Sequence, residues 1–200
     1  MALPPKLVIA TRNDHKVREI QRIFGGPVDW VTFRDASWPD VEETEDTYQA
    51  NALLKAHEVA AATGLPALAD DSGIEVDALG GAPGVRSARF AGDDATDQDN
   101  LQLLLERLRG VPPAERTARY RCVAVCAFPE GEEVTAEGTC EGTLSLEPRG
   151  RGGFGYDPAF VPLGETRTMA ELTPEEKDAI SHRGTAFRKL RDKLVERTPA

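Results

Sequence analysis

The chain has 200 residues, of which 40% are hydrophobic and 29% charged, as in an ordinary globular protein rather than a disordered one. Its formal net charge of −10 disfavours a nucleic-acid partner, because such affinity comes mostly from Lys and Arg. A small phosphorylated ligand, held by a few cations and a metal ion, remains compatible with this charge. No apolar run approaches the roughly 20 residues that cross a bilayer, and residues 1–6 lack the apolar core of a signal peptide, so no membrane partner is expected.

The three cysteines are Cys122, Cys126 and Cys140, without CxxC spacing. This pattern favours reduced, buried thiols in a cytoplasmic protein over a disulfide framework. Cys122 and Cys126 would share one face of a strand, but no further soft ligand is spaced nearby. Core packing is therefore favoured over a metal site.

The chain opens with a strand and a helix. Residues 6–11 are apolar and β-branched without alternation, as in a buried parallel strand, and apolar residues then recur at helical spacing as far as Phe24. Thr11, Asn13 and Lys16 therefore sit on a strand-to-helix turn. Asn13 or Asp14 can cap the helix, whose free N–H groups make an anion site. Lys16, about one turn in, can reach a bound phosphate. The alternative is a plain helix cap with a solvated lysine.

A second strand is predicted at residues 28–33, followed by an acidic stretch at 40–46. The next helix spans about 47–63, since it is rich in Ala and Leu and is followed by a glycine, which typically ends a helix. Thr44 or Asp46 is placed to cap this helix.

The most informative stretch is residues 69–73, Ala-Asp-Asp-Ser-Gly, which follows a short apolar run. A strand that ends in Asp70 and Asp71 brings carboxylates to the mouth of a sheet, the usual ligand position in α/β folds. Mg2+ prefers such oxygens and usually arrives with substrate phosphates. Glu42 and Glu43 precede the helix cap and could point across a cleft at Asp71, although acidic residues before a helix are often only partners of its dipole. The alternative is a turn that only caps the strand.

A further helix begins at about Thr96, and its leucines form one apolar stripe that faces the core. Two long strands then flank a turn, at about 119–128 and 134–146, which predicts a hairpin. Such a pair, within about 117–147, would extend the sheet to form a second lobe.

A glycine-rich loop covers residues 150–158. Its glycines let the backbone approach a ligand closely, and Phe154 and Tyr156 offer flat faces to a base. Asp157 is a fixed acceptor before a proline. The alternative is a flexible loop whose aromatic rings pack into the core.

The last third begins with a capping box at Thr173, which opens a short helix. Lys177, His182 and Arg183 then make a donor-rich group that would individually pass as surface charges. A final amphipathic helix is predicted from about Thr185.

Six motifs follow one another along the chain: Thr11-x-Asn13-x-x-Lys16; Glu42-Glu43-Thr44 with Asn51-Ala52-x-x-Lys55-Ala56; Asp70-Asp71-Ser72-Gly73; Gly80-Gly81-Ala82-Pro83-Gly84; Gly152-Gly153-Phe154-Gly155-Tyr156-Asp157-Pro158; and Ser181-His182-Arg183-Gly184. In this order and spacing they closely resemble the inosine triphosphate pyrophosphatase family, the non-canonical purine dITP/XTP pyrophosphatases. The resemblance extends from Leu7 to about Arg191. One departure is that the family often has Glu-Asn-Ala where this chain has Ala50-Asn51-Ala52.

The resemblance implies an α/β fold: a long, bent mixed sheet flanked by helices, in one domain (1–200) with two lobes and the active-site cleft between them. It also implies a homodimer. The implied enzyme is a nucleoside-triphosphate pyrophosphatase that uses Mg2+. It would hydrolyse a purine nucleoside triphosphate (ITP, dITP or XTP) to the monophosphate and pyrophosphate by water attack at the α-phosphorus.

The resemblance also implies roles for individual residues. Asp71 would be the catalytic proton acceptor and, with Glu43, a metal ligand. The triphosphate would be held by Thr11, Asn13 and Lys16, with Ser72 contacting the substrate beside Asp71. The base and sugar site would be lined by Phe154, Gly155, Tyr156 and Asp157, and completed by Lys177, His182 and Arg183.

Two rival functions stay open. A septum-formation (Maf-like) nucleotide pyrophosphatase would share the phosphate chemistry but prefer other bases, so a substrate panel discriminates it. A nucleotide-sensing module would bind the triphosphate without turnover. The acidic pair Asp70-Asp71 and the cations Lys16 and Lys177 argue against the second rival.

Overall fold

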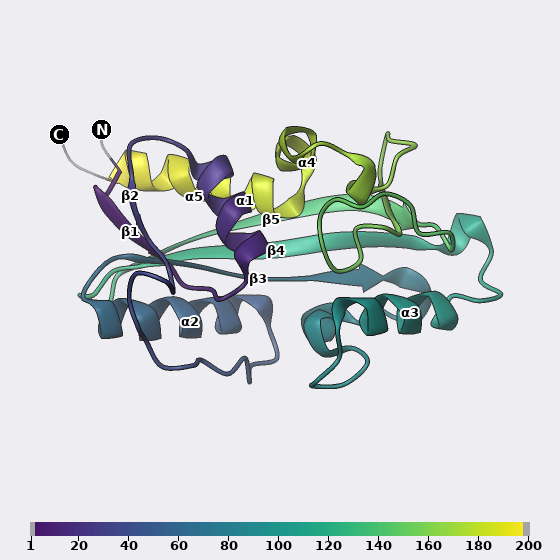
Figure 1. Ribbon diagram of the computed structural model, residues 1–200, viewed down its shortest axis with the longest axis horizontal. Helices are drawn as coiled ribbons and strands as arrows, with labels where there is room; N and C mark the ends of the chain where they lie inside the picture. The colour runs from purple at the N-terminus through teal and green to yellow at the C-terminus, as the bar shows by residue number, and fades with distance from the viewer. Residues whose placement is uncertain (1–2, 198–200) are drawn as a thin grey trace. The chain divides into compact units, whose positions relative to one another are not determined.

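The computed structural model describes residues 3–197, which form a mixed α/β fold with helices flanking a sheet (Figure 1). The sheet has six strands in the order β2-β1-β3-β4-β5-β6. It is mixed, because β1 pairs in parallel with both β2 and β3, whereas β5 and β6 are antiparallel. This confirms the predicted fold class. Within residues 3–197, no helix has the length and apolar character needed to cross a membrane.

The strands are β1 (Lys6–Ile9), β2 (Asp29–Val31), β3 (Ala67–Val76), β4 (Thr117–Ala127), β5 (Glu133–Leu144) and β6 (Phe160–Pro162). The helices are α1 (Asp14–Phe24), α2 (Tyr48–Thr63), α3 (Asp97–Arg107), α4 (Pro174–Ile180) and α5 (His182–Arg197). Short 3-10 helices cover Asp77–Leu79, Gly84–Arg89, Pro113–Glu115 and Met169–Glu171.

The chain divides into two compact units. The first unit comprises the residues up to Asp71, Cys122–Gly138 and the residues from Arg183 onward. The second unit comprises Ser72–Arg121 and Thr139–His182. The cleft implied by the family resemblance stays a prediction.

In the first unit, α1 and α5 cover one face of the sheet and α2 covers the other (Figure 1). The helical spacing of apolar residues explains this: Ile20 and Phe24 of α1 pack with Leu190 of α5 and with the buried strand β1. Cys122 and Cys126 belong to this core as free thiols, as expected.

In the second unit, the predicted leucine stripe of α3 is buried through Leu101, Leu104 and Leu108. Cys140, the third free thiol, is buried in the same cluster. Thr96 caps α3 in a capping box with Asp99, as the sequence indicates.

Three of the differences from the predicted boundaries bear on the candidate site. Thr47 caps α2 by accepting a hydrogen bond from the Ala50 N–H at 3.1 Å, so neither Thr44 nor Asp46 is the cap. The final helix α5 begins at His182, which places His182 and Arg183 in its first turn. The strand predicted to end at Asp70 and Asp71 continues to Val76. Carboxylates in a buried strand are tolerated here because cations approach them, as the site shows.

Candidate active site

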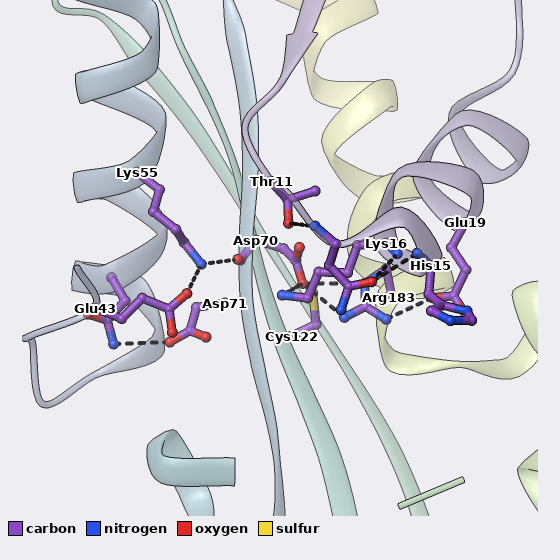
Figure 2. Close-up of polar contacts among 12 residues, drawn as sticks. Thr11, His15, Lys16, Glu19, Glu43, Lys55, Asp70, Asp71, Cys122 and Arg183 are labelled. Atoms are coloured by element: carbon purple, nitrogen blue, oxygen red, sulfur yellow. Dashed lines mark hydrogen bonds and ion pairs between the residues drawn. The ribbon is translucent and has the colours of Figure 1, made fainter. Parts of the chain in front are cut away.

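Asp70 and Asp71 lie in the middle of β3, and their carboxylates point to opposite faces of the sheet (Figure 2). This follows from strand geometry, in which successive side chains alternate between the two faces. Asp70 points toward α1 and α5, whereas Asp71 points toward α2 and the loop before it. Two adjacent acidic residues therefore have different electrostatic surroundings.

Cations surround Asp70. Its Oδ2 lies 3.2 Å from Lys16 Nζ and accepts hydrogen bonds from Arg183 Nη2 at 3.0 Å and Nε at 3.3 Å. Cys122 Sγ is 3.8 Å from the same oxygen. Burial would raise the pKa of Asp70, but the charges of Lys16 and Arg183 outweigh it and hold this pKa far below its usual range. Lys16 and Arg183 therefore stabilise the charged form of Asp70.

Arg183 is 2% exposed and bridges two carboxylates. Besides Asp70, it binds Glu19 of α1, whose Oε2 accepts from Nη1 at 2.8 Å. Burial would lower the pKa of Arg183, but Asp70 and Glu19 together raise it. Each of its guanidinium nitrogens thus donates to a carboxylate of the first unit. The grouping of Arg183 with Lys177 at the base stays a prediction.

Glu19 was not among the predicted site residues. It lies one helical turn after Lys16 on α1, and this three-residue spacing, which brings side chains to the same face, was the signal that could have found it.

On the other face of β3, Asp71 lies near a second carboxylate. Its Oδ2 accepts a hydrogen bond from Asn51 Nδ2 at 3.1 Å, and Glu43 points toward it (Figure 2). Lys55 of α2 pairs with Glu43 and donates to the Asp70 backbone oxygen at 2.6 Å. Neither Asn51 nor Lys55 was among the predicted site residues, although they are four residues apart on one helix face.

The pKa values of the two carboxylates on this face are shifted in opposite directions. Burial raises the pKa of Asp71, and Glu43 adds to the rise against the opposing charge of Lys55. Burial would raise the pKa of Glu43 as well, but Lys55 and Lys16 outweigh it, so this pKa is lowered. A cation bound between the two carboxylates would stabilise the charged form of both.

The donor set on this face fits a hard divalent cation. Within residues 3–197, no three His, Cys, Asp or Glu side chains form a group that could hold a metal ion on protein ligands alone. Mg2+ is commonly bound through one or two carboxylates together with substrate phosphates and waters. Glu43 and Asp71 provide such a pair, so they could hold an ion that arrives with a phosphorylated substrate.

The turn between β1 and α1 forms as predicted. Asn13 caps α1, with its Oδ1 accepting from the N–H groups of His15 at 2.9 Å and Lys16 at 3.2 Å. The Asn13 N–H donates to Thr11 Oγ1 at 3.2 Å. Lys16 is not the solvated lysine of the alternative interpretation, because its side chain is 15% exposed and pairs with Asp70.

A separate cluster in the second unit is centred on Asp157. Its Oδ2 accepts from Lys177 Nζ at 2.6 Å and from the Phe154 N–H at 2.9 Å. Tyr120, which was not predicted, donates to Asp157 Oδ1 at 3.3 Å, and its ring stacks on that of His182 at 4.5 Å. Lys177 Nζ also lies 5.0 Å from the centre of the Phe154 ring. Four of the predicted base-site residues therefore meet here, organised by a tyrosine from β4.

Other predicted residues of the second unit have structural contacts. Tyr156 is 4% exposed, packs in the core and donates its hydroxyl to the Ser87 backbone oxygen at 2.7 Å, and burial raises its pKa. This supports the alternative in which an aromatic ring of the loop packs inward, rather than one that offers a face to a base. The Gly155 N–H donates to Asp97 Oδ2 at 2.9 Å. Ser72 is half-buried in β3.

A mixed α/β fold that combines a capped strand-to-helix turn, an adjacent lysine and paired carboxylates is typical of an enzyme that handles phosphorylated substrates. The chain belongs to the Ham1 family, whose family model matches residues 7–193. This confirms the family predicted from the sequence motifs.

Relatives of the chain are named for one activity. The chain is 54% identical over 190 residues to a dITP/XTP pyrophosphatase of Streptomyces coelicolor, covering 92% of this chain and 94% of the relative. It is 50% identical over 195 residues to a dITP/XTP pyrophosphatase of Escherichia coli K12, covering 94% and 98%. The predicted enzyme class, a nucleoside-triphosphate pyrophosphatase, is the class for which these relatives are named.

Solved structures of Ham1 proteins share the fold of this chain. A HAM1 protein from Coxiella burnetii matches with a TM-score of 0.85 at 42% identity, covering 96% of this chain and 98% of that one. The Staphylococcus aureus Ham1 protein matches with a TM-score of 0.82 at 36% identity, covering 96% and 100%.

Proposed function

We propose that the chain hydrolyses non-canonical purine nucleoside triphosphates, such as dITP, XTP and ITP, to the monophosphate and pyrophosphate. The observation that carries the proposal is the opposed orientation of Asp70 and Asp71 in β3. On one face of β3, the cations Lys16 and Arg183 balance the charge of Asp70. On the other face, Asp71 and Glu43 form a pair of carboxylates. The names of the relatives add the substrate class.

Water attack at the α-phosphorus expels pyrophosphate, and such transfers depend on positioning and charge neutralisation more than on covalent chemistry. Lys16, at the N-terminal turn of α1, is assigned to the triphosphate together with Thr11 and Asn13. Asp71 is assigned as the acceptor of the proton of the attacking water. When bound by Glu43 and Asp71, a divalent cation such as Mg2+ would neutralise phosphate charge.

The base and sugar are assigned to the Asp157 cluster. Phe154 offers an aromatic face. Its ring is half-buried, and Lys177 Nζ lies 5.0 Å from the centre of the ring. His182 is held by stacking on Tyr120. Ser72 and Gly155 are assigned to substrate contact through their place in the matching motifs. The homodimer stays a prediction, which sedimentation of the purified chain would test.

The deciding experiment measures the products released from dITP, XTP, ITP, ATP and GTP, with and without Mg2+. We expect one pyrophosphate for each monophosphate, a requirement for the divalent ion, and preference for the non-canonical purines. Orthophosphate with a nucleoside diphosphate would mean attack at the γ-phosphorus and would overturn the mechanism. Preference for pyrimidine or methylated nucleotides would favour the Maf-like alternative. Binding without turnover would favour the sensing module.

A further inference from the structure

Four charged side chains of the first unit alternate in sign along a line of contacts: Glu19, Arg183, Asp70 and Lys16 (Figure 2). We call them the Asp70 cluster. The exposed fractions of their side chains are 8% for Glu19, 2% for Arg183, 0% for Asp70 and 15% for Lys16. The cluster is therefore almost closed to solvent at Glu19 and Arg183 and most open at Lys16.

The open end of the Asp70 cluster coincides with the proposed phosphate site. The Lys16 N–H belongs to the first turn of α1, next to the Asn13 cap, where a helix binds anions. The anion that pairs with the Lys16 ammonium is Asp70, at 3.2 Å. A phosphate bound at this turn would share the same ammonium and would be repelled by the carboxylate.

The position of Asp70 is fixed by its other contacts. Arg183 holds Oδ2 through two nitrogens, and Glu19 fixes the far side of the guanidinium. Its second oxygen, Oδ1, is buried and has no hydrogen-bond partner among residues 3–197. A carboxylate kept only for fold stability would be expected to have both oxygens satisfied, because an unpaired buried acceptor is costly.

We propose that Asp70 is a positioning residue that restrains Lys16 and lowers the affinity of the site for pyrophosphate, so that this product dissociates. Asp70 contacts neither the reacting atoms nor a metal ion in this scheme, and it acts through Lys16. The inference rests on the proposed function, because that function makes pyrophosphate the leaving product.

The test is calorimetric titration of the full chain with inorganic pyrophosphate. Asp70→Asn keeps the shape and an acceptor oxygen but removes one negative charge near Lys16. We expect pyrophosphate to bind roughly tenfold more tightly or better, since the lost repulsion acts over a few ångströms in a buried setting. KM and kcat for dITP should fall together, as when a product is retained. The matched control is Glu58→Gln on α2, which removes the same charge from an exposed position and should leave the affinity unchanged.

A double-mutant cycle tests the route through Lys16. In a Lys16→Gln background, Asp70→Asn should no longer tighten pyrophosphate binding. A gain of the same size in both backgrounds would show that Asp70 acts without Lys16. If Asp70→Asn lowers the melting temperature but leaves the affinity unchanged or weaker, its role is structural and the inference is wrong.

A second variant covers the case in which Asp70→Asn does not fold. Glu19→Gln removes a charge from the closed end of the Asp70 cluster, and a smaller tightening in the same direction is expected. No tightening in a folded Glu19→Gln variant would then overturn the inference. The products of the wild-type chain distinguish a failure of the proposed function from a failure of the inference about Asp70. No pyrophosphate from any nucleotide would refute the proposed function. Normal release with an unaltered affinity in the variants would refute only the role of Asp70.

Discussion

Asn51 of α2 holds Asp71 and the acidic loop at the same time. Its Nδ2 donates to Asp71 Oδ2 at 3.1 Å and to the Glu45 backbone oxygen at 3.1 Å, while its Oδ1 accepts from the Glu45 N–H at 3.0 Å. The side chain is fully buried. One amide therefore fixes the Asp71 carboxylate relative to the segment that carries Glu43.

The first prediction concerns the catalytic role of Asp71. Asp71→Asn keeps the shape of the side chain but removes a charge and a proton acceptor, so kcat should fall by roughly 10²-fold or more. The melting temperature should change little, because burial already disfavours the charged form. The measurement is pyrophosphate release from dITP, with Glu42→Gln as the control at an exposed neighbour of Glu43. Normal turnover by Asp71→Asn would remove Asp71 from the catalytic role.

The second prediction concerns the ion pair of Lys177 and Asp157, whose side chains are 6% and 4% exposed. Lys177→Met would leave the Asp157 carboxylate buried and without its cation, which should cost about 3–5 kcal/mol of unfolding free energy. The double variant Lys177→Met with Asp157→Asn removes both charges and should recover part of the loss. Denaturant unfolding measures both, and KM for dITP should rise in each. A single variant as stable as the wild type would show that the pair contributes little to the second unit.

The third prediction concerns base choice. Each guanidinium nitrogen of Arg183 donates to a carboxylate, so we expect this side chain to hold Asp70 and Glu19 rather than to read the C6 oxygen of a purine. Arg183→Lys should therefore lower kcat/KM for ITP and ATP by similar factors. The measurement is the ITP/ATP ratio in the variant and the wild type. A clear fall in this ratio would return Arg183 to the base site.

The sequence predicted the elements whose signals are local. The cap at Asn13, the glycine after α2, the leucine stripe of α3 and the capping box at Thr173 all agree with the structure. Each depends on residues within one or two helical turns of each other, so each can be predicted without knowledge of the fold.

The parts that the sequence did not predict depend on distant residues. Asp70 resembles a strand end because acidic residues are rare in a buried strand, and the charge of Asp70 is compensated by residues distant in the chain, such as Lys16 of α1 and Arg183 of α5. The contact of Arg183 with Glu19, 164 positions away in the chain, likewise gives no local signal. Tyr120 gave no signal, since an aromatic residue in a β-strand is more often core than site.

The last prediction concerns Ala50, where the family often has a glutamate. The structure places Ala50 at the third position of α2, with its N–H on the capping Thr47, and the first turn of α2 contains no acidic residue. A glutamate here could reach back to the N–H of the cap and complete a capping box, and it would also favour the helix dipole. Ala50→Glu should therefore raise the unfolding free energy by roughly 0.5–1 kcal/mol and change kcat little.

The comparison that separates these roles uses two further variants at the same position. Ala50→Gln can complete the capping box without a charge and should give part of the stabilisation. Ala50→Lys can do neither and should destabilise the helix, because a cation at its N-terminal turn opposes the dipole. Melting temperatures and dITP turnover are measured for all three. A large gain of kcat in Ala50→Glu alone, without a gain in stability, would mean that the glutamate serves catalysis and that Ala50 limits the activity of this chain.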